Sequence, residues 1–276
     1  MQPDSLARPQ DRELLTAFLQ RFRLPADQPP LDLLRAVAAA FTQLPYENLT
    51  KIIKQDQEQA AVRARRLPAE VLADHVRFGA GGTCFSLTAT LLHLVRALGW
   101  EAEPLLADRR YGENTHCALL VWIDGRPHLL DPGYLILNPI PLDTGSTTQI
   151  VTEFNELLLT PSADGRRLDL ATLSQGQQKH RLTFKTSPAD PGEFLHAWDA
   201  SFDWDMMRYP VLTRVCAGQQ LYLQGGRLQT RDRQSVRREN VSAAQLVARI
   251  AERFGLAPEI AARALAILHR QGEPYG

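Results

Sequence analysis

The chain has 276 residues, of which 44% are hydrophobic and 22% are charged. This composition supports a folded core and argues against a disordered chain. Lys and Arg together number 31, as do Asp and Glu, so the formal net charge is zero. Such a balance gives no general attraction for nucleic acid or an anionic membrane, and we expect neither as a partner. We interpret two short basic runs, 63–66 and 231–238, as solvated faces.

The cysteine content and the first residues predict where the protein works. Three cysteines are too few for a disulfide framework in a chain of this length. The first residues are polar and lack the apolar segment of a secretory signal. No apolar run approaches the roughly 20 residues that cross a bilayer. We therefore expect a cytoplasmic protein whose thiols are free.

The first hundred residues are predicted to be helical. Apolar residues recur at helical spacing in 14–22 and in 32–41, with prolines between the two segments. A loop follows at 44–49, because Pro45 disfavours a helical conformation at the residue before it. The polar, basic stretch 55–66 is interpreted as an exposed helix or linker.

Glycines lead into the one cysteine that begins a predicted helix. Gly79, Gly81 and Gly82 precede Cys84, and the apolar stripe that starts there ends at Gly99. A helix N-terminus lowers the pKa of a thiol. The glycines also leave backbone N–H groups free to approach an acyl oxyanion. An isolated buried cysteine is more often a small core residue, so this pattern needs a second observation.

A predicted hairpin supplies that second observation. Apolar residues from Cys117 lead to the two-residue turn Asp124-Gly125, and a return strand ends at Asp131. With that turn, His116 is opposite residue 133 and Asp131 is its diagonal neighbour on the same face, about 7–8 Å away between Cα atoms. A histidine oriented by a carboxylate is the base that a cysteine nucleophile requires. Cys117 should point to the opposite face, into the core.

The remainder of the chain gives weaker patterns. Short strands are predicted near 156–160, 181–185 and 220–223, followed by a helix capped by Ser242 and a last helix over 257–268. No Cys/His spacing predicts a zinc site. An aromatic cluster is interpreted as packing under the β region, with the lining of an acceptor pocket as the alternative; it comprises Trp198, Phe202, Trp204 and Tyr209.

Three stretches carry a resemblance to a known family. Leu-Pro-Tyr-Glu-Asn-Leu at 44–49 resembles the motif I-P-F-E-N-L, and Gly-Gly-Thr-Cys-Phe at 81–85 resembles R-G-G-x-C-F. His116, followed by Asp-Pro-Gly-Tyr at 131–134, resembles H…D-V-G-F. On these motifs the chain resembles the arylamine N-acetyltransferases, within the transglutaminase-like Cys-His-Asp acyltransferases.

The resemblance implies an α+β fold in three parts. They are a helical N-terminal bundle that carries the nucleophile (1–100), a β-barrel-like middle that carries His and Asp (101–205) and a small α/β lid (206–276). Cys84, His116 and Asp131 would be catalytic. The implied substrate-binding residues are Tyr46, Phe85 and Tyr134.

The implied reaction moves an acyl group, most simply acetyl, from a CoA thioester to an amine by a ping-pong mechanism. Acetyl-CoA or another acyl thioester would be the co-substrate, a small-molecule amine the acceptor, and no metal would take part. One alternative is an amide synthase that takes a larger acyl chain from an acyl carrier protein. Another is a scaffold that binds without catalysis.

The chain departs from the family motifs at several positions. Ala80 replaces the arginine of R-G-G, which in the family supports the glutamate at the position of Glu47. Ser86, Pro132 and Tyr134 are further changes. A buried carboxylate needs a partner, so another cation is expected to serve Glu47, and Arg77 is the candidate nearest to Cys84. The alternative is a solvated Glu47.

Overall fold

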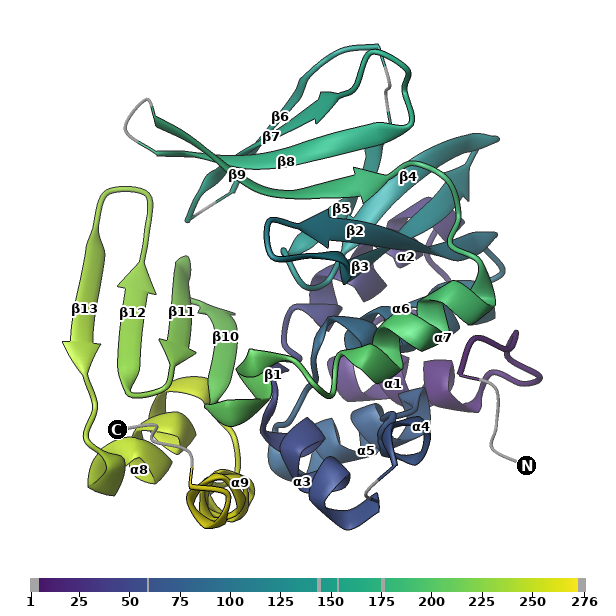
Figure 1. Cartoon of the computed structure of the whole chain (residues 1–276). Coiled ribbons are helices and arrows are strands. Elements are labelled where there is room, and N and C mark those ends of the chain that lie inside the picture. Colours follow the sequence, from purple (N-terminus) through teal and green to yellow (C-terminus); the bar gives the residue numbers. More distant parts are fainter. Residues whose placement is uncertain (1–4, 59, 143–144, 153, 175–176, 273–276) are drawn as a thin grey trace.

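A computed structural model describes residues 5–58, 60–142, 145–152, 154–174 and 177–272. The N-terminal part is helical and lies beneath the first strands of the middle sheet (Figure 1). A two-residue strand, β1 (Tyr46–Glu47), interrupts these helices. The helices are α1 (Glu13–Phe22), α2 (Pro30–Phe41), α3 (Leu49–Glu58), α4 (Ala61–Ala64), α5 (Pro68–Phe78) and α6 (Cys84–Ala97).

The middle of the chain forms an antiparallel sheet of eight strands among the described residues, in the order β5-β4-β3-β2-β9-β8-β7-β6. The sheet curls, so that β6 to β9 rise above β2 to β5 (Figure 1). The strands are β2 (Ala102–Arg109), β3 (Gly112–Ile123), β4 (Arg126–Asp131), β5 (Ile136–Pro141), β6 (Thr148–Val151), β7 (Glu156–Pro161), β8 (Arg167–Ser174) and β9 (Gln177–Lys185).

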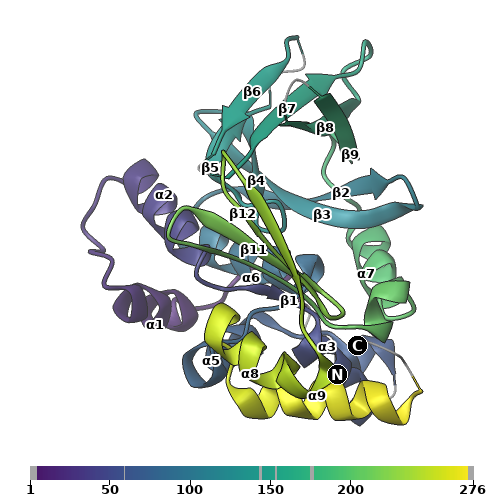
Figure 2. The same cartoon turned by 90° about the vertical axis from the view of Figure 1, so that its left-hand side faces the viewer.

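A second sheet joins the two ends of the chain. Its order is β1-β10-β11-β12-β13, so a strand from the helical part pairs with the C-terminal strands. Helices α8 and α9 lie below this sheet, whose strands run in front of α6 in the turned view (Figure 2). The remaining elements are α7 (Pro191–Ala200), η1 (Asp205–Arg208), β10 (Val211–Cys216), β11 (Gln219–Gln224), β12 (Arg227–Arg231), β13 (Val236–Asn240), α8 (Ala243–Phe254) and α9 (Pro258–Arg270).

Helix α6 is the centre of the main core. Eleven of its residues are buried, including all of Cys84 to Leu92, so the usual polar face of a surface helix is missing. A second apolar cluster fills the curled sheet and includes Leu105, Leu157 and Phe184. The predicted α+β fold, with helices first, a curled β middle and an α/β C-terminal part, is confirmed.

Several local predictions are confirmed and one is wrong. The hairpin pairs Leu119 with Leu130 and Leu120 with Leu129, which is the predicted register. Ser242 occupies the N-cap of α8, but its hydroxyl bonds to the Gln245 side chain and not to the helix backbone. The basic run 63–66 is not a solvated face throughout, because Arg66 is only 3% exposed. Its charge is compensated inside the protein, as described below.

Across the described ranges, none of the helices has both the length and the apolar character needed to traverse a bilayer.

Candidate active site

The loop before α3 is fixed against the glycines before α6. Gly82 donates its N–H to the Pro45 carbonyl at 3.2 Å, and the Gly82 carbonyl accepts the N–H of Glu47 at 2.9 Å. A Cβ atom on Gly81 would lie 1.8 Å from the Pro45 carbonyl oxygen, which no side chain tolerates. Glycine is therefore required at residue 81, and its absence of a side chain lets two separate motifs meet beside Cys84.

Cys84 is the first residue of α6 and is 2% exposed. The first N–H groups of a helix have no carbonyl partner within it and carry partial positive charge. Both features favour a thiolate at this position and leave donors for a developing oxyanion. The structure thus places Cys84 at the helix start, where the sequence predicts it.

The hairpin brings His116 and Asp131 together in the core. Nε2 of His116 lies 2.7 Å from Oδ2 of Asp131, and both side chains are fully buried. The other carboxylate oxygen of Asp131 accepts the N–H groups of Gly133 at 2.8 Å and Tyr134 at 2.9 Å. A Cβ atom on Gly133 would lie 2.7 Å from Cε1 of His116, so glycine makes room for the ring.

The charges of this group favour an ion pair between sulfur and imidazole. Burial opposes protonation of His116, but the Asp131 carboxylate outweighs it and the pKa of the ring is raised. The pKa of the Cys84 thiol lies well below its usual value, first because of a hydrogen bond from the Cys117 thiol and then through His116, with burial acting in opposition. A lowered thiol pKa beside a raised imidazole pKa is the arrangement of an activated cysteine.

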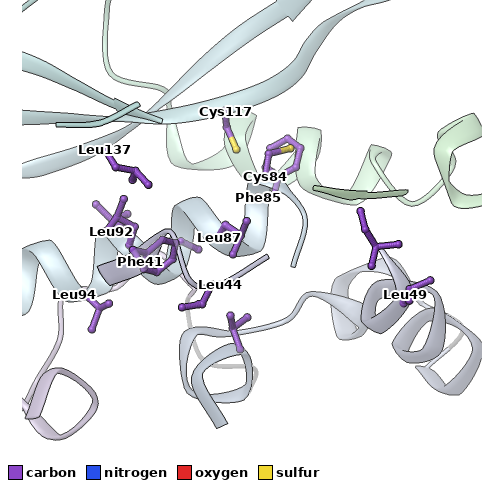
Figure 3. Close-up of a cluster of buried hydrophobic side chains, with 14 of the residues drawn as sticks. Phe41, Leu44, Leu49, Cys84, Phe85, Leu87, Leu92, Leu94, Cys117 and Leu137 are labelled. Carbon is purple, nitrogen blue, oxygen red and sulfur yellow. The ribbon is translucent and has the colours of Figure 1, made fainter. Parts of the chain in front are cut away.

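Cys117 is a part of this group that the sequence did not reveal. Burial, followed by the hydrogen bond to Cys84, raises the pKa of Cys117, so it stays a thiol and can donate. Its Sγ also lies 3.4 Å from the Thr88 hydroxyl. Figure 3 shows the Cys117 side chain pointing from β3 toward the start of α6, where Cys84 lies. The prediction of a core position is confirmed, and the effect of Cys117 on the pKa of Cys84 adds to it.

Replacing Cys117 tests its effect on Cys84. Cys117→Ala removes the donor, so the midpoint of the pH profile for alkylation of Cys84 is expected to move to higher pH. Cys117→Ser keeps a donor and should move the midpoint less. Iodoacetamide alkylation followed by mass spectrometry measures both, in a Cys216→Ala background because Cys216 is exposed. Identical profiles for all three proteins would show that Cys117 does not tune Cys84.

The cation that serves Glu47 is Arg66, not Arg77. Glu47 is fully buried, and Nη1 of Arg66 lies 3.6 Å from its Oε1. Thr50 binds the same carboxylate through its N–H at 2.9 Å and donates its hydroxyl to it as well. Arg77 instead lies at the surface against the Phe78 ring, at 4.7 Å from the centroid. The prediction that another cation replaces the missing arginine is confirmed, whereas the choice of Arg77 is wrong.

Arg66 also ties the glycine loop to its surroundings. It donates to the Gly81 carbonyl and, at 2.6 Å, to the Thr50 hydroxyl, and it pairs with Asp74 at 2.7 Å. Ala80 is fully buried, so the space of the family arginine is closed by a small side chain. The positive charge beside the Glu47 carboxylate therefore comes from residue 66 and not from residue 80.

The three predicted substrate-binding residues lie in different surroundings. The Tyr134 ring meets His116 edge-on, with 5.4 Å between centroids. Tyr46 is half-buried in β1, where it pairs with Gly82, and its hydroxyl lies 3.7 Å from the Met206 sulfur. Phe85 is fully buried and packs on Phe194 and Trp198, so it belongs to the aromatic core and its contact with substrate stays a prediction.

Lys51 is a buried cation close to this aromatic core. It is 4% exposed, donates to the Ser201 carbonyl at 2.7 Å and lies 4.2 Å from the centroid of the Phe202 ring. Burial lowers the pKa of Lys51 to about 7, although the negative charge on Cys84 acts in the opposite direction. No pattern in the sequence indicated this position, since Lys51 resembles an ordinary surface residue of a helix.

Lys51 should make the stability of the protein depend on pH. In the unfolded chain its pKa is about 10.4, so between pH 7 and 10 the unfolded state holds more protons than the folded state. The free energy of unfolding should therefore rise with pH in this window, by about 1 kcal/mol per pH unit from this group. Urea unfolding from pH 7 to 9 should show this rise in the wild type relative to Lys51→Met. Parallel curves for the two proteins would contradict it.

The structure also contains a cavity of about 740 Å³. It is bordered by α2, β5, β10 and the turn around Leu135, with Arg35 and Arg233 at its edge. None of Cys84, His116 and Asp131 lines it. The cavity is therefore separate from the sulfur in this structure. No cluster of three or more metal-binding side chains occurs among the described residues.

A known protein family matches most of this chain. A family model described as N-acetyltransferase matches residues 30–263, most of the chain. Comparison with curated protein sequences gave no match.

Solved structures share the fold at low sequence identity. An arylamine N-acetyltransferase from Mycobacterium smegmatis is 23% identical, with a TM-score of 0.74 and coverage of 92% of this chain and 98% of that one. The enzyme from Mycobacterium abscessus is 18% identical, with a TM-score of 0.77 and coverage of 92% and 94%. The enzyme from Mycobacterium marinum in complex with CoA is 20% identical, with a TM-score of 0.74 and coverage of 93% and 98%.

Proposed function

Because this chain belongs to the arylamine N-acetyltransferase family of enzymes, we propose that Cys84 carries an acetyl group from acetyl-CoA to an aromatic amine. The observation that carries the proposal is the buried alignment of three side chains on α6, β3 and β4. In that alignment Asp131 holds Nε2 of His116 at 2.7 Å, and His116 lowers the pKa of the Cys84 thiol.

The first half-reaction forms an acyl-cysteine. His116 takes the thiol proton at Nδ1, because its Nε2 is held by Asp131. The sulfur attacks the thioester carbonyl, and the N–H groups at the start of α6 bind the oxyanion. When the tetrahedral intermediate collapses, the bond to the CoA sulfur breaks and the His116 proton restores the CoA thiol.

The second half-reaction reverses these roles. The amine nitrogen attacks the acyl carbon, and His116 removes the proton from the attacking nitrogen. The bond to Cys84 then breaks, and an amide and a thiolate result. Asp131 stabilises the imidazolium in both halves without taking the proton itself.

The choice of donor rests on the relatives. The Mycobacterium marinum enzyme was solved in complex with CoA, and this supports acetyl-CoA as the donor for the present chain. The chemistry at Cys84 would be the same for an amide synthase that uses a longer acyl chain. A scaffold without catalysis is disfavoured, because the loss of the arginine at Ala80 was its support and Arg66 now reaches Glu47.

Separation of the two half-reactions tests the proposal. The protein should be incubated with acetyl-CoA and, in parallel, with longer acyl thioesters, then freed of donor by gel filtration. The isolated acyl-protein should release its acyl group as the amide when aniline or 4-aminobenzoate is added. Turnover that requires donor and amine together, with no isolable acyl-protein, would contradict the ping-pong order. Acylation by long-chain thioesters alone would favour the amide synthase.

A further inference from the structure

An arginine that has no carboxylate partner among the described residues lies against the proposed catalytic group. Arg109 ends β2, and its Nη2 lies 3.1 Å from Nδ1 of His116, the ring nitrogen that Asp131 does not hold. Its Nη1 donates to the Tyr111 hydroxyl at 2.7 Å, and the Tyr134 ring centroid is 5.8 Å from Cζ. Two tyrosines and one histidine thus surround this cation, and none of the three carries a full negative charge at neutral pH.

The nearby carboxylates are engaged elsewhere. Asp108 pairs with Arg167 at 3.0 Å and accepts the N–H of Asn114 at 2.9 Å. Asp131 is occupied by His116 and two backbone N–H groups. Nε of Arg109 is buried and has no hydrogen-bond partner among the described residues. Burying this N–H of a cation without an acceptor is unfavourable, and an anion at this position would supply one.

The Cys84 thiolate balances the positive charge of Arg109 during only part of the reaction. It offers a negative charge to Arg109 before acylation, but acylation converts the sulfur into a neutral thioester. The guanidinium is then left beside the acyl group and the entering amine, with no carboxylate from the described part of the chain to balance its charge. A CoA phosphate cannot fill the position, because the long pantetheine arm separates the phosphates from the reacting carbonyl.

We propose that Arg109 binds a carboxylate on one of the two substrates, close to the reacting carbon. The inference rests on the proposed function, since it assigns a substrate class to the same site. The carboxylate belongs either to the acceptor, as in an aminobenzoate, or to the acyl group, as in a dicarboxylic half-thioester. The planar guanidinium suits either one, because it offers paired N–H donors to two carboxylate oxygens.

Carboxylate binding would also change the hydrogen bonds of His116. In the described arrangement Arg109 donates to Nδ1, which favours the neutral ring with its proton on Nε2, toward Asp131, and so opposes the ion pair with Cys84 that the Asp131 carboxylate favours. A carboxylate competes for the same guanidinium donors and would draw them away from the ring. Nδ1 is then free to accept a proton from the thiol or the amine. A substrate with a carboxylate would thereby release the base that it needs.

Ligand binding tests the assignment without any need for turnover. We suggest NMR titration of the full chain with 4-aminobenzoate and with succinate, each compared with its uncharged amide. The wild type should bind at least one carboxylate more tightly than its amide. Arg109→Gln should raise the Kd of that carboxylate ligand at least tenfold. The Kd of the matching amide should change by less than about threefold. Arg109→Lys should keep part of the preference, since it retains a point charge without the paired donors.

The adjacent Arg110 provides a matched control, because it is exposed and its replacement removes the same charge from the surface. Arg110→Gln should bind both ligands of each pair as the wild type does. A preference for 4-aminobenzoate identifies the acceptor as the source of the carboxylate, and a preference for succinate identifies the acyl group. Equal affinities for carboxylate and amide in the wild type, or equal losses for both in Arg109→Gln, would overturn the proposal. An absent acyl adduct on Cys84 would refute the proposed function and leave this binding result standing.

Discussion

Asp131→Asn is expected to slow acyl transfer by about 10³–10⁴-fold while the protein stays folded. The amide fits the same space and can still accept the N–H groups of Gly133 and Tyr134. It cannot hold His116 with a proton on Nε2 and the base at Nδ1, and it does not stabilise an imidazolium. The rate of formation of the acyl-protein, followed by rapid quench and intact mass, measures the loss at the step that uses the base.

Two observations make this test specific. The circular dichroism spectrum and thermal midpoint of Asp131→Asn should remain close to those of the wild type, so that the loss reflects chemistry. Asp169→Asn is a matched control, because Asp169 is an exposed carboxylate 3.6 Å from the exposed His180. It should leave the rate unchanged. Acylation by Asp131→Asn at a rate near that of the wild type would remove Asp131 from the mechanism.

Arg66→Ala is expected to cost about 3–5 kcal/mol of stability, the range found when one partner of a buried ion pair is removed. Arg66 is buried with Glu47, and its guanidinium holds Thr50 and the Gly81 carbonyl as well. Its loss leaves the Glu47 carboxylate buried with only Thr50 to bind it, and removes the side-chain donor from the Gly81 carbonyl. Urea unfolding measures the difference in free energy.

Arg63 supplies the control for this substitution. Its ion pair with Glu58, at 3.5 Å, is largely exposed, so Arg63→Ala should cost at most about 1 kcal/mol. Glu47→Gln combined with Arg66→Ala should lose much less than the sum of the single variants. Additive losses, or an Arg66→Ala variant as stable as Arg63→Ala, would show that Arg66 does not replace the arginine missing at Ala80.

The sequence predicted the parts of the site that depend on local rules. A two-residue turn fixes a hairpin register, so the alignment of His116 with Asp131 followed from counting residues. Glycines before an apolar stripe placed Cys84 at a helix start. These features depend only on the residues near them in the chain.

The remaining features depend on contacts between distant segments. The basic run 63–66 looked solvated because charge density in sequence does not show which side chain turns inward, as Arg66 does toward Glu47. The roles of Lys51 and Cys117 depend on contacts with residues that are distant in the chain, and the sequence does not predict those contacts. Strand β1 was missed because two residues carry no periodicity, and it forms only because β10 is available to pair with it.

The central claim, that Cys84 carries the acyl group, is tested most directly by the intact mass of the protein after exposure to acetyl-CoA without amine. The wild type should gain one acetyl group, and peptide mapping should place it on Cys84. Cys117→Ala and Cys216→Ala should gain it as well, whereas Cys84→Ala should gain none. An adduct that persists in Cys84→Ala, or a wild type that never becomes acylated by any acyl thioester, would contradict the account.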